Sequence, residues 1–280
     1  MCTPSTETPA LLVARGLSQQ YRKTNLFSGS VLAVPAFEDV SLVLHRRTTL
    51  ALVGESGVGK SSLARCLTLL EKPLRGELLF EGQNLLKLSK DELLPFRRAI
   101  QLVFQDPTSS LNPRLTAAEI IAEPLLVQRE GASGLRHQRA LQLMGQVGLP
   151  MKWSDKRPLE FSGGQRQRLA IARALALRPS LIIFDEALSN LDIESQELIL
   201  RLLADLQSEH RLTYIHVSHD LQLVSRIADE CAVMHQGRIV EHKPIARLLE
   251  HQDDPYTREL FAGMSSVESI LKNRFAEVVP

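Results

Sequence analysis

The sequence predicts an α/β protein, because short apolar runs alternate with helical patterns along most of its length. The apolar runs, each the length of a buried strand, are residues 49–53, 100–104, 180–184, 212–217 and 231–234. Runs that are apolar on both faces are typical of strands in a parallel sheet that helices cover on both sides. Helical patterns lie between several of them, at residues 61–70, 165–177, 193–209 and 221–228.

Composition narrows the class of protein. The chain has 280 residues, of which 44% are hydrophobic and 23% are charged, the balance of a folded globular protein. The net charge of +1 creates no overall field that would attract nucleic acid, so we expect no nucleic-acid partner. No stretch approaches the roughly 18–20 apolar residues of a membrane-spanning helix, so a membrane role would require a partner.

The rest of the chain surrounds this α/β core. Residues 11–13 and 40–44 read as strands around a loop at 23–35, and we expect a mixed or antiparallel flap there. Residues 91–160 are mostly helical, with expected helices at 116–130 and 135–147 separated by a turn at 131–134. The turn at 235–238 should join two short strands, and a helical tail should begin at Pro244.

Residues 54–61 fit the phosphate-binding loop pattern of a glycine, four residues, Gly-Lys and then Ser or Thr. An apolar strand precedes them and a helix follows, which is the context the pattern requires. Glycines allow backbone N–H groups to surround phosphate oxygens, and the helix N-terminus adds partial positive charge. Lys60 would reach the β- and γ-phosphates and Ser61 would ligate Mg²⁺. The alternative is a glycine-rich turn without a ligand.

The run 181–184 places Asp185 and Glu186 at the carboxyl end of a buried strand, the edge where open α/β sheets bind ligands. Asp185 would be the second anchor for Mg²⁺. Glu186, one residue further, could orient and polarise the attacking water as a general base. Taken alone, the pair could instead simply end a strand.

Residues 161–168 read Phe-Ser-Gly-Gly-Gln-Arg-Gln-Arg, and this segment resembles the signature motif of ABC ATPases. Ser162 can cap the helix that follows, and the glycines leave N–H donors exposed at its positive end. The resemblance implies a P-loop NTPase (RecA-like) core with an antiparallel β subdomain and an inserted helical signature subdomain. It also implies that each nucleotide lies between one phosphate-binding loop and the signature of a second subunit.

Four further positions resemble family elements. Gln105 matches the Q-loop glutamine, which touches Mg²⁺ and the attacking water; Asp192, in Ser189-Asn190-Leu191-Asp192, matches the D-loop. His219 matches the switch histidine that contacts the γ-phosphate, and Tyr21 is the candidate for stacking on adenine, ahead of Phe27.

The complete hypothesis assigns roles by group. The expected catalytic residues are Glu186, His219 and Gln105. The expected Mg²⁺ ligands are Ser61, Gln105 and Asp185. Nucleotide binding falls to Tyr21, Gly54, Glu55, Ser56, Gly57, Val58, Gly59, Lys60, Ser61 and Ser62. The signature that faces the partner's nucleotide comprises Ser162, Gly163, Gly164 and Gln165.

The resemblance spans about residues 11–262 and is greatest to ATPase subunits of peptide and nickel importers. It rests on the segments 54–57, 104–107, 110–114 and 254–260, and the stretch 185–192 resembles nickel-type members. The expected division is 8–90 and 166–243 for the core with its β subdomain, 91–165 for the helical subdomain and 244–280 for the tail. Some peptide-importer ATPases carry a C-terminal cysteine cluster that binds iron and sulfur. Because no cysteine follows Cys231 here, we expect no such cluster.

The resemblance implies ATP and Mg²⁺ as ligands, and membrane-spanning permease subunits and a second ABC ATPase subunit as partners. It implies an indirect link to an extracytoplasmic binding protein and a place on the cytoplasmic face of the plasma membrane. The cargo, and the choice between homodimer and heterodimer, stay open. The alternatives are an ABC ATPase of a soluble enzyme complex, of the carbon–phosphorus lyase type, and a catalytically inactive structural subunit.

Overall fold

The computed structural model describes residues 10–24, 31–189 and 191–262. These described residues form two compact units, one up to residue 94 together with those from residue 213 onward, and the other between residues 95 and 212. This division does not test the expected boundaries at 91, 165 and 243, which stay predictions. Each unit is described by itself.

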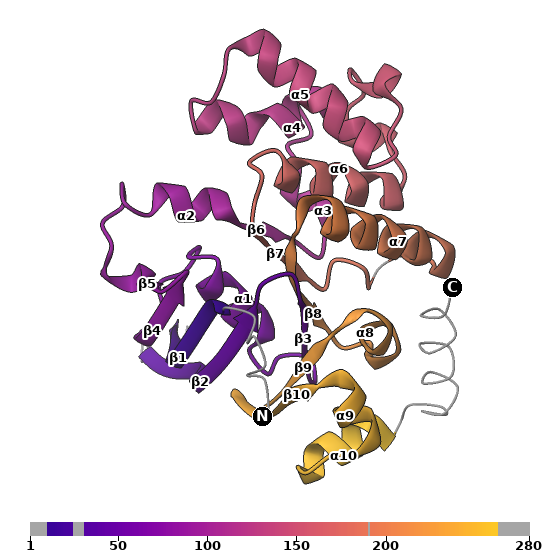
Figure 1. Ribbon diagram of the computed structural model, residues 1–280. Helices are drawn as coiled ribbons and strands as arrows, with labels where there is room; N and C mark the ends of the chain where they lie inside the picture. The colour runs from indigo at the N-terminus through magenta and orange to yellow at the C-terminus, as the bar shows by residue number, and fades with distance from the viewer. Residues whose placement is uncertain (1–9, 25–30, 190, 263–280) are drawn as a thin grey trace, which may run out of the picture. The chain divides into compact units, whose positions relative to one another are not determined.

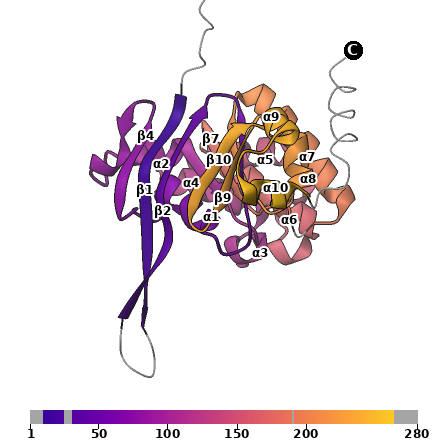
Figure 2. The same cartoon turned by 90° about the horizontal axis from the view of Figure 1, so that it is seen from below.

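The first unit contains an antiparallel sheet in the order β2-β1-β4-β5, as the expected flap requires. Its strands are β1 (Ala10–Thr24), β2 (Val31–His45), β4 (Arg75–Phe80) and β5 (Gln83–Asn84). In register, Leu12 pairs with Leu44 of β2 on one side and with Phe80 of β4 on the other, and all three side chains are buried. The strands β1 and β2 run side by side as one long hairpin (Figure 2). Residues 23–24 and 31–35 of the expected loop are therefore strand, and Phe27 lies outside the described residues.

The same unit contains the strands β3 (Thr49–Val53), β8 (Thr213–Ser218), β9 (Glu230–His235) and β10 (Arg238–Pro244), in the order β10-β9-β3-β8. The strand β3 is parallel to β8 and to β9, and every residue of β3 and β8 is buried. The turn between β9 and β10 has positive φ at both Gln236 (47°) and Gly237 (78°), as a tight two-residue hairpin turn requires. The strands and the turn predicted here are confirmed.

Helices complete the first unit. They are α1 (Lys60–Leu67), the 3-10 turn η1 (Leu85–Lys87), α8 (Leu221–Ile227), α9 (Ile245–Glu250) and α10 (Pro255–Ala262). The helices α9 and α10 form the expected helical tail as far as the structure describes it, and they pack beside β10 (Figure 1).

The second unit carries two parallel strands, β6 (Ile100–Val103) and β7 (Leu181–Asp185), and a set of helices. These are α3 (Pro107–Ser110), α4 (Ala117–Val127), α5 (Ser133–Gln146), α6 (Gly163–Leu175) and α7 (Ile193–His210), with 3-10 turns η2 (Met151–Trp153) and η3 (Pro158–Glu160). The short α2 (Leu94–Ala99) spans the boundary between the units in the sequence. The helices α4, α5 and α6 pack against one another (Figure 1).

Local chemistry explains where these helices begin. Thr116 caps α4 with a reciprocal bond to Glu119, and Asp192 caps α7 by accepting from the Ser195 N–H. The helix α7 ends at Arg211, which adopts the left-handed conformation. In the part of the chain that the structure describes, no helix is sufficiently long and apolar to cross a membrane.

Candidate functional site

The loop between β3 and α1 has a backbone that only glycine fits at its two ends. At Gly54 (φ 148°) a Cβ atom would lie 2.2 Å from the carbonyl oxygen of Met234, and at Gly59 (φ 104°) one would lie 2.2 Å from that of Ala36. Both contacts are with backbone atoms, which cannot move aside as a flexible side chain can. The glycine pattern is therefore a requirement of this loop's path, and the loop leads into the N-terminus of α1 at Lys60.

Lys60 is folded back into this loop. Its ammonium donates to the carbonyl oxygens of Gly54 (2.8 Å) and Glu55 (2.7 Å), and the residue is only 3% exposed. A buried cation beside a helix N-terminus and a curled backbone favours an anion such as phosphate. A hollow of about 430 Å³ borders residues 55–58 on one side, where residues 35–38 and 235–237 line it as well.

His219 follows β8 as the phosphate-binding loop follows β3. The two strands are parallel neighbours, and Val53 pairs with Ser218, so the loop and His219 both leave the sheet at the same edge. That carboxyl edge is where open α/β sheets bind ligands. His219 is exposed, and Asp220 after it caps α8 by accepting from the Leu223 N–H at 3.0 Å.

Tyr21 lies in β1 and is 38% exposed. Its hydroxyl donates to the Glu71 carboxylate at 2.6 Å, and Glu71 also pairs with Arg65 of α1 at 2.8 Å. The ring is thereby held beside the helix that follows the phosphate-binding loop. Its role against adenine stays a prediction.

In the second unit, Asp185 ends β7 and is 7% exposed, and Glu186 follows it with a left-handed backbone (φ 49°). Such a backbone is uncommon for a residue other than glycine, and it is often found at functional sites. The strands β6 and β7 end together, because Val103 pairs with Phe184. The side-chain amide of Gln105 therefore reaches Glu186 and donates to its carboxylate at 3.0 Å.

The predicted cap of the signature helix is confirmed. The Ser162 hydroxyl accepts from the Gln165 N–H (3.4 Å), while the Gln165 side chain accepts from the Ser162 N–H (3.0 Å). Phe161, before the cap, is 3% exposed and packs edge-to-face on Trp153 with ring centroids 6.0 Å apart. Its aromatic ring therefore serves as an apolar anchor for the start of α6.

The signature and the D-loop meet within this unit. A Cβ atom at Gly164 would lie 3.2 Å from the Ser195 hydroxyl, which itself donates to Asp192 at 2.8 Å. Hydrogen bonds from Ser195 lower the pKa of the Asp192 carboxyl, so it stays ionised at the start of α7. Asn190 of the D-loop lies outside the described residues.

Oxygen donors of Ser61, Gln105 and Asp185 are of the type that Mg²⁺ prefers. Ser61 belongs to the first unit and the other two belong to the second. Among residues 10–24, 31–189 and 191–262, no group of three or more His, Cys, Asp and Glu side chains is placed to hold a metal ion. The shared role of Ser61, Gln105 and Asp185 in binding Mg²⁺ stays a prediction.

One contact was missed at the level of sequence. The Tyr256 hydroxyl accepts a hydrogen bond from the Glu55 N–H of the phosphate-binding loop at 3.2 Å. The segment 254–260 stood out in the sequence only as a family marker. No local pattern could have joined residues 201 positions apart.

The ABC transporter family model matches residues 37–189, which is just over half of the chain. The chain belongs to the ABC transporter family, as one of its ATP-binding subunits. A protein of Sinorhizobium fredii with the name Probable peptide ABC transporter ATP-binding protein y4tS is 48% identical over 91% of this chain and 72% of its own length. The Dipeptide transport ATP-binding protein DppF of Escherichia coli is 45% identical over 90% of this chain and 76% of its own length.

Solved structures agree with the fold of an ABC ATPase. The dimeric ATP-binding cassette MJ0796, in a post-hydrolysis state bound to ADP and Pi, matches with a TM-score of 0.72 at 29% identity, covering 84% of this chain and 98% of that one. The protein cbiO1 of Clostridium perfringens, part of the ABC transporter complex cbiONQ, matches with a TM-score of 0.73 at 25% identity, covering 97% and 96%. The α/β fold with a P-loop NTPase core is thus confirmed, and this ABC ATPase binds and hydrolyses ATP.

Proposed function

We propose that this ABC ATPase powers the import of peptides through separate membrane-spanning subunits. The observation that supports peptides as the cargo is that the similarity to peptide-transport proteins extends over nearly the whole chain. Identity of 42–48% to proteins named for peptide or dipeptide transport covers 90–92% of the chain, far beyond the shared family segment at 37–189. Glutathione is itself a peptide, and a relative named for its import is 44% identical over 91% of this chain and 41% of the relative's own length. Nickel, the other cargo that the sequence suggested, has no such support among these relatives.

The proposed working form is a pair of ATPase subunits, either two copies of this chain or this chain and a close relative. Each nucleotide would lie between the Lys60 loop of one subunit and the Ser162 cap of the other. The dimeric state of MJ0796 supports this arrangement. Closure of the pair around ATP would favour one access state of the attached membrane subunits, because the nucleotide binds that conformation more tightly.

In the proposed hydrolysis, Glu186 accepts a proton from the attacking water, and Gln105 holds the Glu186 carboxylate in place. His219 and Lys60 would donate to the γ-phosphate oxygens as negative charge moves toward the leaving group. When bound, Mg²⁺ neutralises charge on the β- and γ-phosphates, and the chain's ligands for it would be Ser61, Gln105 and Asp185. Tyr21 would stack on adenine.

The proposed location is the cytoplasmic face of the plasma membrane, where the permease subunits would hold the ATPase, with an extracytoplasmic binding protein delivering cargo to them. Affinity purification of the tagged chain from detergent-solubilised membranes tests these partners. Recovery of membrane-spanning subunits together with one or two kinds of ATPase subunit is the expected result. A stable soluble complex without spanning subunits would instead favour an accessory role in a soluble enzyme.

Uptake tests the cargo itself. Cells that carry the complete transporter should accumulate a labelled dipeptide, and the Glu186→Gln variant should not. Nickel uptake without peptide uptake would contradict the proposal, and the absence of phosphate release by the purified complex would point to an inactive structural subunit.

A further inference from the structure

The peptide group that joins Gly54 and Glu55 is held from both sides. Its carbonyl oxygen, on Gly54, accepts a hydrogen bond from the Lys60 ammonium at 2.8 Å. Its N–H, on Glu55, donates to the Tyr256 hydroxyl at 3.2 Å. Because a peptide group is planar, these two bonds together fix the rotation of the plane and thus the direction of the carbonyl that holds Lys60.

The Tyr256 ring is itself restrained. It stacks on His235 at the end of β9, with centroids 3.8 Å apart and an interplanar angle of 27°. His235 also lines the hollow beside residues 55–58. The side chain of Tyr256 is therefore already ordered, so the hydrogen bond between its hydroxyl and the Glu55 N–H costs little further conformational entropy.

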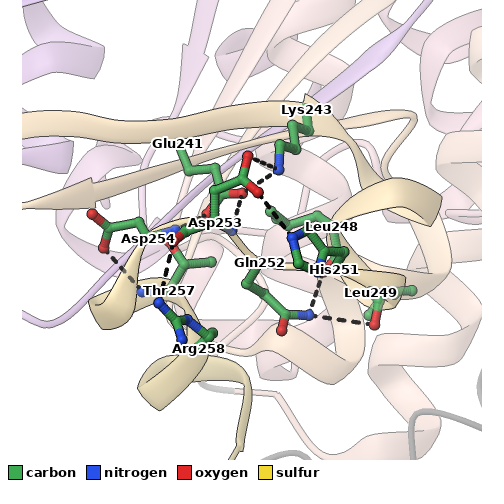
Figure 3. Close-up of polar contacts among 10 residues, drawn as sticks. All are labelled: Glu241, Lys243, Leu248, Leu249, His251, Gln252, Asp253, Asp254, Thr257 and Arg258. Carbon is green, nitrogen blue, oxygen red and sulfur yellow. Dashed lines mark hydrogen bonds and ion pairs between the residues drawn. The ribbon is translucent and has the colours of Figure 1, made fainter.

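The helix α10, which carries Tyr256, is fastened to β10 by a polar cluster (Figure 3). Glu241 of β10 accepts hydrogen bonds from the backbone N–H groups of Asp253 (3.0 Å) and Asp254 (3.3 Å). Lys243 bridges Glu241 (2.7 Å) and the Asp253 carboxylate (2.5 Å). The Glu241 side chain is only 4% exposed, so these bonds lie in a partly dehydrated environment where they are stronger than in water.

Asp254 completes the attachment at the start of α10. Its carboxylate accepts from the Tyr256 N–H at 2.8 Å and from the Thr257 N–H at 3.3 Å. Thr257 itself is fully buried. The backbone of residues 253–257 is thereby fixed, and Tyr256 extends from it to the phosphate-binding loop.

We propose that Tyr256 is a positioning residue for ATP binding: its hydroxyl orients the Gly54–Glu55 peptide so that Lys60 is held ready for the β- and γ-phosphates. Tyr256 acts through the loop and does not touch the nucleotide. A hydrogen bond to the N–H of a peptide also makes its carbonyl a better acceptor, which strengthens the hold on Lys60. The proposal rests on the ATP binding of the family and adds a link from the C-terminal helix to the phosphate-binding loop.

Tyr256→Phe tests the proposal, because it removes the hydroxyl and keeps the stacked ring. With the full-length chain, we expect ATP and ADP to bind about 2- to 10-fold more weakly, the usual effect of one hydrogen bond. Phe261→Leu is the matched control, since Phe261 is a buried apolar residue of the same helix and the change leaves Tyr256 and the bonds to Glu241 in place. It should lower thermal stability and leave nucleotide affinity within about twofold of the parent.

The Glu55 amide gives a readout that does not require nucleotide. In Tyr256→Phe its hydrogen exchange should become faster than in the parent, while in Phe261→Leu it should not. Unchanged exchange at Glu55 would overturn the proposal whatever the chain's affinity for ATP, and so would equal losses of ATP affinity in the two variants. Should Tyr256→Phe fail to fold, Glu241→Gln, which weakens the attachment of α10, is expected to weaken ATP binding and speed Glu55 exchange. Failure of the parent chain itself to bind ATP would count against the function, not against this contact.

Discussion

The side-chain amide of Gln105 donates a hydrogen bond to the carboxylate of Glu186 at 3.0 Å. The two residues follow neighbouring parallel strands, so the sheet brings the Q-loop glutamine and the proposed base together without any ligand. The bond also gives Glu186 a defined orientation despite its strained backbone. Any shift of the segment after β6 would therefore change the orientation of the Glu186 carboxylate, the proposed base.

Glu186→Gln should reduce ATP turnover by about 100-fold or more, because an amide cannot accept the proton of the attacking water. The affinity for ATP should remain within about twofold, since glutamine keeps the size of the side chain. Phosphate release and equilibrium nucleotide binding measure the two quantities separately. Glu194→Gln, at an exposed position in the first turn of α7, is the control and should hydrolyse at the parent rate. Parent-like turnover in Glu186→Gln would rule out Glu186 as the base.

Lys60→Ala should weaken ATP binding by about 10-fold or more. The change removes the charge that would meet the phosphates, and it also leaves the carbonyl groups of Gly54 and Glu55 without their donor. Titration with ATP and with ADP checks this expectation. Lys90→Ala, at an exposed position of the same unit, should bind as the parent does. Equal ATP affinity in the parent, Lys60→Ala and Lys90→Ala would contradict the assignment of this loop to phosphate binding.

Ser162→Ala and Thr116→Ala form a matched pair, because both residues cap a helix with the same reciprocal bonding. Each substitution should cost about 1 kcal/mol of stability. Only Ser162→Ala should also reduce turnover, since only that cap would face the partner's nucleotide. Thermal unfolding and phosphate release by the assembled pair measure both effects. Similar losses of activity in the two variants would reduce the role of Ser162 to helix stability.

Features set by local chemistry were predictable from the sequence. The strand β3 has the predicted bounds, the cap at Ser162 is present, and the turn at 235–238 follows from the glycine at 237. Strands that form only because they pair with another strand were not predictable from the sequence. The strands β4 and β5 carry no clear alternation, and they form because β1 supplies a partner for β4.

Contacts between distant residues were also beyond sequence reasoning. Tyr21 was assigned to adenine because it matches the aromatic position of the family pattern, whereas its bond to Glu71 depends on how β1 lies beside the end of α1. The Gln105–Glu186 and Tyr256–Glu55 bonds join residues 81 and 201 positions apart, and they exist only once the strands are in register.

Acid should weaken the hydrogen bonds that the Glu241 carboxylate accepts, because it protonates that carboxylate. Burial by itself would raise the pKa of the Glu241 carboxyl, but hydrogen bonds from the Asp253 N–H, from Lys243 and from the Asp254 N–H outweigh it and hold the pKa below its usual 4.5. A carboxyl whose pKa is lowered by folding contributes stability above its unfolded pKa, and it loses that contribution as the pH falls through its folded pKa. The parent should therefore lose thermal stability between about pH 5 and about pH 3 more steeply than Glu241→Gln.

The slope in Glu241→Gln should be reduced rather than abolished, because Asp253 remains and its hydrogen bond from Lys243 likewise lowers its pKa. Melting temperatures measured across this range check the difference. Glu250→Gln, at an exposed position of α9, should keep the parent's slope. Since the same cluster fastens the helix that carries Tyr256, Glu55 exchange should quicken over the same fall in pH in the parent, beyond the change that pH alone makes to amide chemistry. Identical acid slopes for the parent and Glu241→Gln would show that the bonds to Asp253 and Asp254 do not depend on the charge of the carboxylate.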